Sequence, residues 1–245
     1  MKLHLKSLAA PVAIATLGLS VGLPVASSSF AATAAPVAVA ASTTYTATLN
    51  KLNHSSASGN VTIVLTGDQA VITEHTEGLA ATFDGKPYPH VQHIHIDGQG
   101  TCPNPSADLN GDGVVNTTEG KPSYGAIGTS LTLSGDTSPA AGTALNVAPS
   151  GAGFDYSRTI TLDAKTLASL TGGKAVIVVH GLDPATLSAQ AQGEPSDLVP
   201  SLPLAATSPA LCGALAVQAV STTSSTPTPT AVAPAPTKAR PAFTG

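Results

Sequence analysis

The chain has 245 residues, a length typical of one domain of ordinary size with extra segments at its ends. Its formal net charge is -4 and only 10% of its residues are charged, so no basic patch predicts binding to nucleic acid. Aromatic residues make up 3% of the chain and Trp is absent, so the core must be built from Val, Ile, Leu and Ala. Such a core favours strands, because β-branched residues fit a pleated, half-buried surface.

The N-terminal segment has the pattern of a secretory signal peptide. Two lysines lie within residues 1–6, an apolar stretch follows, and small residues occupy the places that a signal peptidase reads. The alternative is a membrane anchor, but Pro11, Gly18, Gly22 and Pro24 interrupt the apolar stretch. We therefore predict a signal peptide over 1–32, a linker over 33–43, no membrane span, and export to the cell envelope or the extracellular space.

The segment from 44 to 220 predicts one β domain. Short runs rich in Val, Ile and Thr are separated by turn residues, a spacing typical of an antiparallel sandwich or barrel. The predicted strands cover 44–52, 59–67, 69–76, 89–96, 124–134, 154–162, 174–180 and 212–220. Residues 164–170 are the one stretch that could form about two helical turns.

The C-terminal segment 221–245 is of a different kind. Its sequence is rich in Pro, Thr, Ser and Ala and cannot bury a core. It predicts an extended, disordered stalk, and the cell wall is the partner that such a stalk would reach.

Two cysteines, Cys102 and Cys212, lie within the predicted domain. An even number of cysteines in an exported chain indicates a disulfide. Because this disulfide would close a long loop, it should stabilise the fold by about 4–5 kcal/mol.

Three histidines are candidate metal ligands. His93 and His95 lie two residues apart in a predicted strand, so their side chains point to the same face and form a potential chelating pair. Two surface histidines on an edge strand would give the same pattern. His180 ends the most hydrophobic predicted strand, where it is either a packed core residue or a further ligand.

Four short segments in the same order resemble the Cu/Zn superoxide dismutases. They are residues 77–79 with 90–98 (HVQHIHIDG), 178–180 (VVH), 210–215 (ALCGAL), and Cys102 shortly after the histidine pair. The resemblance covers about residues 44–220 and implies an all-β, Greek-key antiparallel β-sandwich or barrel. It further implies that His93, His95 and His180 bind copper and that Cys102 pairs with Cys212. His90 falls on the opposite strand face and would support the ligands indirectly.

The chain also departs from that family. No histidine lies between His95 and His180, so both the bridging ligand and the family-type zinc site are missing. Pro209 stands where the family has an arginine that guides superoxide, and Gln92 replaces an apolar residue. Since dismutation needs an open copper site and electrostatic guidance of an anion, we expect dismutase activity to be absent or well below that of the family.

A calcium-type loop stands where the zinc loop would be. The sequence DLNGDGVVNTTE over 108–119 matches the twelve-residue calcium loop position by position. The predicted calcium ligands are Asp108, Asn110, Asp112, Val114 through its carbonyl, Asn116 and Glu119. A polar surface turn is the alternative. We expect no helices at its flanks, because Pro103, Pro105, Gly120 and Pro122 disfavour them.

Three classes of function remain open from the sequence. The first is a copper redox enzyme, and the second is a non-catalytic module that holds or buffers copper. The third is a calcium-stabilised structural or adhesive module of the cell envelope. Three imidazoles also suit zinc with an open water position. Secreted CHRD domains resemble the sequence as well, with their own His-x-His strand.

Overall fold

The computed structural model describes residues 40–219. The predicted signal peptide (1–32), most of the predicted linker (33–43) and the predicted stalk (221–245) lie outside the described residues. None of the helices within 40–219 is both long enough and apolar enough to cross a membrane.

The described chain is built mainly from antiparallel strands, which confirms the predicted all-β class. The strands are β1 (Ser42–Lys51), β2 (Ser58–Thr66), β3 (Gln69–Glu77), β4 (Thr82–Phe83), β5 (Lys86–Pro87), β6 (Gln92–Asp97), β7 (Gly125–Ser130), β8 (Gly153–Thr161), β9 (Val176–His180), β10 (Pro209–Ala214) and β11 (Ala216–Val217).

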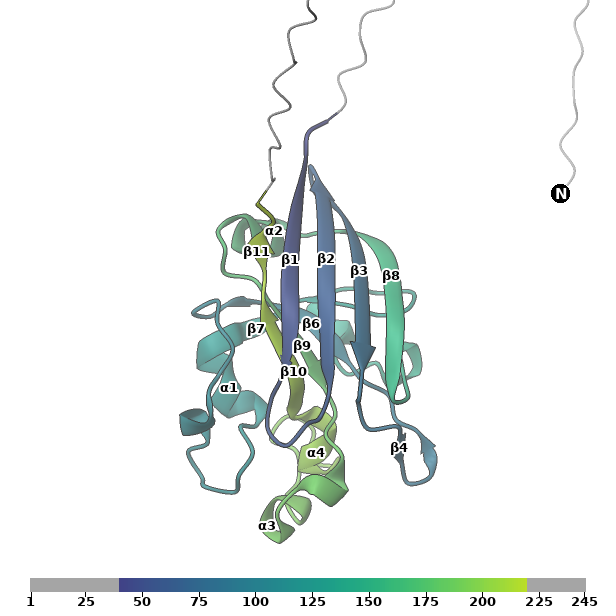
Figure 1. The fold of residues 1–245 in the computed structure, drawn as a ribbon, viewed down its shortest axis with the longest axis vertical. Helices are drawn as coiled ribbons and strands as arrows, with labels where there is room; N and C mark the ends of the chain where they lie inside the picture. The colour runs from purple at the N-terminus through teal and green to yellow at the C-terminus, as the bar shows by residue number, and fades with distance from the viewer. Residues whose placement is uncertain (1–39, 220–245) are drawn as a thin grey trace, which may run out of the picture. The chain divides into compact units, whose positions relative to one another are not determined.

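One curled sheet contains all strands except the β4–β5 hairpin. Its order is β7-β6-β9-β10-β1-β2-β3-β8, with β11 paired to the start of β1. In Figure 1, β1, β2, β3 and β8 lie side by side across one half, and β6, β7, β9 and β10 form the other. The chain leaves β3, crosses to β6, and returns from β7 to β8 beside β3. These crossings between strands that are not sequential are Greek-key connections.

The core lies inside the curl of the sheet. Strand β3 alternates strictly between exposed and buried residues, as expected for a strand with one face on a core. Strand β9 differs, because all its residues are buried. Ile177 and Val179 face the main core, whereas Val176 and Val178 pack outside the curl with Tyr124 and Cys212. The outer face of β9 is therefore covered.

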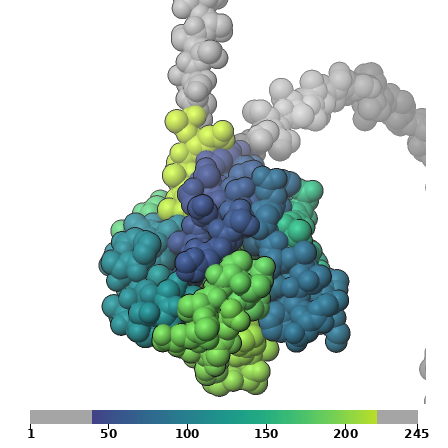
Figure 2. All heavy atoms as spheres, turned by 60° about the horizontal axis from the view of Figure 1, so that its bottom comes forward, coloured from purple at the N-terminus to yellow at the C-terminus, as the bar shows by residue number. Residues whose placement is uncertain are grey.

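Helices are few and short. They are α1 (Thr117–Tyr124), α2 (Ala164–Thr171), α3 (Ala189–Gln192) and α4 (Leu204–Thr207), and 3-10 turns cover Pro105–Ala107, Pro139–Ala141, Leu145–Val147 and Pro184–Thr186. The predicted helical turns over 164–170 correspond to α2, whose N-cap Asp163 accepts hydrogen bonds from two backbone N–H groups. Figure 2 shows the segment after β9 in green, lying at the surface between the teal segment that contains α1 and the blue segment of β3–β5.

The expectation of no helix beside the calcium-type loop is wrong at its C-terminal flank. Helix α1 begins inside the loop sequence and includes both Gly120 and Pro122. Its start is fixed by a capping box, in which Asn116 accepts from the backbone of Glu119 and Glu119 accepts from the backbone of Asn116. This cap outweighs a proline that lies near the end of a helix of only two turns.

The predicted disulfide is present in the fold. Cys102 and Cys212 are bonded, with their Cα atoms 5.8 Å apart. The bond joins the loop after β6 to β10 across a sequence separation of 110 residues.

Candidate metal centre

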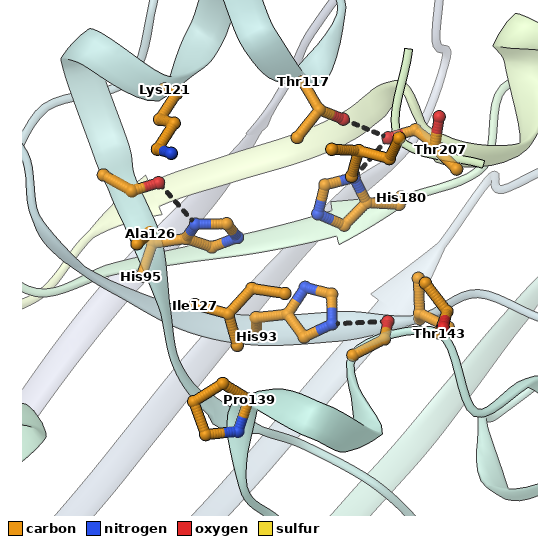
Figure 3. A pocket seen from close by; sticks show the side chains of 14 residues that line it. His93, His95, Thr117, Lys121, Ala126, Ile127, Pro139, Thr143, His180 and Thr207 are labelled. Carbon is orange, nitrogen blue, oxygen red and sulfur yellow. Dashed lines mark hydrogen bonds between the residues drawn. The ribbon is translucent and has the colours of Figure 1, made fainter. Parts of the chain in front are cut away.

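The three histidines of the sequence analysis meet on the outer face of the sheet. His93 and His95 alternate with Gln92, Ile94 and Ile96 along β6, so the two imidazoles share one face. His93 pairs with Val178 of β9, and His180 lies two residues further along that strand, on the same face. Figure 3 shows the three rings turned toward one another.

The three rings are close enough to share one metal ion. Their centroids lie 5.5 Å apart for His93 and His95, 5.2 Å for His93 and His180, and 5.9 Å for His95 and His180. One ring nitrogen from each lies within 4.8 Å of the others. Within residues 40–219, this is the one group of three or more His, Cys, Asp or Glu side chains that meets such a criterion.

Backbone carbonyls fix the tautomer of each ring. His93 Nε2 lies 2.9 Å from the Gly142 carbonyl, His95 Nδ1 lies 3.0 Å from the Gly125 carbonyl, and His180 Nδ1 lies 2.6 Å from the Thr207 carbonyl. A carbonyl can only accept, so each of these nitrogens carries the N–H and donates. The other nitrogen of each ring then presents a lone pair, which is the form that binds a metal.

These lone pairs are buried and have no partner. The three residues are only 2–3% exposed, and His93 Nδ1, His95 Nε2 and His180 Nε2 have no hydrogen-bond partner in the structure. Burial lowers the pKa of His95 to about 3 and that of His180 to about 4, and it lowers the pKa of His93 well below its ordinary value. The imidazoles are therefore neutral at physiological pH, as metal binding requires.

A pocket of about 310 Å³ opens above the histidines. Its lining comes from β6, β9, α1, the start of β7 and the segments around 139–143 and 198–207. The wall residues are mostly apolar: Val91, Ala126, Ile127, Pro139 and Leu198. The candidate centre thus has three imidazoles on its inner side and open space on the other, an arrangement typical of metal sites that accept an exogenous ligand.

Helix α1 supports the centre, a role that could not be predicted from the sequence. The Tyr124 ring packs edge-on against His95 with centroids 4.6 Å apart, and its hydroxyl donates to the Thr117 carbonyl. Thr117 Oγ1 donates to the Thr207 carbonyl, which also accepts from His180. Lys121 lies on the same helix and lines the pocket. No local pattern in the sequence indicates these contacts, because they depend on where α1 lies against the sheet.

His90, predicted as a supporting histidine, lies just before β6 and is fully buried. Its Nδ1 is 2.9 Å from the backbone carbonyl of His180, and its Nε2 is 3.0 Å from the carbonyl of Ala80. Burial lowers the pKa of His90, while these carbonyls act in the opposite direction. His90 therefore touches the backbone of one candidate ligand, on the side away from the three converging lone pairs.

The calcium-type loop is closed by its own hydrogen bonds. The carboxylate of Asp108 accepts from the backbone N–H groups of Gly111 and Gly113, and Glu119 reaches back to accept from Leu109 and Asn116. Asn110 and Asp112 hydrogen-bond to each other, and the Val114 side chain is buried in the core. Among the described residues, the carboxylates of this loop do not form a group of three whose oxygens lie within 4.8 Å of one another, as the three histidine nitrogens do. Calcium binding by this loop therefore stays a prediction.

Gln92, noted as a departure in the sequence, lies inside the curl opposite a buried acid. Its carboxamide faces the carboxyl group of Glu74 on β3, which is only 4% exposed. Burial raises the pKa of Glu74 to about 8. With the carboxyl group protonated, its O–H can donate to the Gln92 carbonyl, while Gln92 Nε2 lies 3.4 Å from the Leu131 carbonyl.

No protein-family model matches the sequence, and no curated protein matches it significantly.

Proposed function

We propose that the chain is an exported metal-binding domain of the superoxide dismutase type, in which His93, His95 and His180 hold one copper ion. The observation that carries this proposal is the set of three buried, neutral imidazoles whose free lone pairs converge at the floor of a pocket. An exported chain is also consistent with the disulfide between Cys102 and Cys212.

Copper is favoured over zinc by its affinity for nitrogen ligands. Copper stands at the top of the divalent affinity order, and imidazole suits it. When bound, copper would supply one-electron redox chemistry. The three imidazoles would hold the ion. The backbone carbonyls that accept from them would keep the rings oriented, and one side of the ion would stay open to the pocket.

We expect this domain to bind copper with little or no dismutase activity. The described part of the chain offers no fourth histidine at the centre, and Pro209 stands where the resembling family has its guiding arginine. The alternative is a non-catalytic, calcium-stabilised module of the cell envelope.

Elemental analysis of the purified protein tests the copper site. After loading and dialysis we expect one copper per chain in the wild type and none in the triple variant His93→Ala, His95→Ala, His180→Ala. His75→Ala is the matched control, because His75 is an exposed histidine on β3 that hydrogen-bonds Asp155. Stoichiometric copper in the triple variant would refute the site, and a fast, copper-dependent dismutase reaction in the wild type would instead establish an enzyme.

For the loop we propose a structural calcium site formed by Asp108, Asn110, Asp112, Val114, Asn116 and Glu119. Calcium that binds only the folded state must raise the melting temperature. Glu119→Gln should remove most of this rise while keeping the side-chain shape that caps α1. Superimposable melting curves in calcium and in chelator would show that the loop is a polar turn and nothing more.

A further inference from the structure

We propose that the pocket above the three histidines binds a small organic carboxylate, with its apolar body against the pocket walls and its carboxylate toward the metal and Lys121. This inference rests on the proposed function, because it assumes a metal ion held by the histidines.

The size of the pocket points to an organic ligand. The pocket has a volume of about 310 Å³. It lies at the lower end of the size range of small-molecule sites. A ligand of two atoms, such as superoxide or dioxygen, would leave most of this space empty.

The walls favour an apolar body. Val91, Ala126, Ile127 and Pro139 line the space, and Leu198 stands at its edge with 50% of its surface exposed. An apolar ligand in this concave site would cover the exposed leucine. This burial would favour binding, because removing apolar surface from water is favourable.

The charge of the pocket lining favours a ligand with a single anionic group. Because the three histidines are neutral, Lys121 is the one charged side chain among the described residues that line the pocket, and no carboxylate lines it. A metal ion on three neutral imidazoles would add positive charge at the floor. Figure 3 shows Lys121 extending from α1 over the same side of the site as His95.

The other polar side chains of the lining are mostly engaged. Thr117 Oγ1 donates to the Thr207 carbonyl, and Thr207 Oγ1 shares a hydrogen bond with Ser196. Asp197, on the neighbouring segment, accepts from Thr118 of α1 and does not line the pocket. The charge of Asp197 acts on His180, where it raises the pKa against the effect of burial, but its carboxylate stays outside the lining, so an incoming carboxylate contacts Lys121 and no protein anion.

Benzoate is a suitable probe, because it combines a flat apolar ring with one carboxylate. The full chain is loaded with Cu(II), its copper content is measured first, and benzoate is then titrated by calorimetry and by the copper electron paramagnetic resonance spectrum. We expect benzoate to bind and to change the spectrum. Benzamide, which has the same shape without the charge, should bind at least tenfold more weakly, and acetate, which lacks the ring, should also bind more weakly.

The variant Lys121→Met separates the charge from the shape of the pocket. It should weaken benzoate about tenfold and leave benzamide unchanged, whereas the exposed Lys51→Met should change neither. Equal affinity for benzoate and benzamide, or no binding to the copper-loaded protein, would overturn this inference alone. Failure of copper to load would be seen before benzoate is added, and it would refute the proposed function together with this inference.

Discussion

Glu74 is a carboxylic acid buried inside the curled sheet, so replacing it with Gln should change how stability depends on pH. Burial raises its pKa from the ordinary value of 4.5 to about 8 in the folded state. Between these values the folded chain keeps a proton that the unfolded chain has released. Stability contributed by this group is therefore present at low pH and lost as the pH rises toward 8.

The magnitude follows from the pKa shift. A difference of one bound proton changes the free energy of unfolding by about 1.4 kcal/mol per pH unit. From pH 5.5 to 7.5 the wild type should therefore lose roughly 2–3 kcal/mol relative to Glu74→Gln, which carries no ionisable group at this position. The Gln side chain keeps nearly the same shape and can still hydrogen-bond Gln92.

Urea unfolding with the disulfide intact, at several pH values across this range, measures the effect. The difference between the two proteins cancels the titration of the histidines, which both contain. Glu77→Gln is the matched control, because Glu77 is an exposed acid on the same strand. Parallel curves for wild type and Glu74→Gln would refute the reasoning, since they would mean that the buried carboxylate is ionised and held by the Gln92 amide.

Two further predictions concern the metal centre. A Cβ at Gly120 would lie 2.5 Å from the Tyr124 ring, so Gly120→Ala should displace this ring from His95 and cost about 1–3 kcal/mol in urea unfolding. Gly193→Ala, whose Cβ would lie 3.4 Å from its nearest neighbour, the carbonyl oxygen of Gln190, should be nearly neutral, and equal losses in both variants would contradict this packing argument. Removal of copper by a chelator should lower the melting temperature, because copper present at 1,000 times its Kd stabilises the folded state by about 4 kcal/mol. An unchanged melting curve would contradict metal binding by the folded state.

Strand periodicity explains why the fold class could be predicted. The i, i+2 spacing of His93 and His95 determines a shared face in any strand, and the strict alternation of β3 determines which side is buried. His180 could be placed beside them only through the family resemblance, because strand pairing joins residues far apart in the chain.

Other features depend on tertiary contacts and could not be predicted from the sequence. The proline and glycine of α1 disfavour a helix locally, but the capping box between Asn116 and Glu119 provides a firm start. The carbonyls of Gly125, Gly142 and Thr207 that orient the imidazoles are backbone groups. Every residue has such a group, so no residue type in the sequence marks the ones that are used.

The carbonyl-bonded imidazoles also determine where protons can come from. Each ring has its N–H committed to a carbonyl and its lone pair directed at the metal position, so none can exchange a proton without breaking one of these bonds. A reaction that consumes protons at this centre, as the conversion of superoxide to hydrogen peroxide does, must draw them from water in the pocket or from Lys121. A carboxylate bound in the pocket would displace this water, so ligand binding and proton delivery compete for one route.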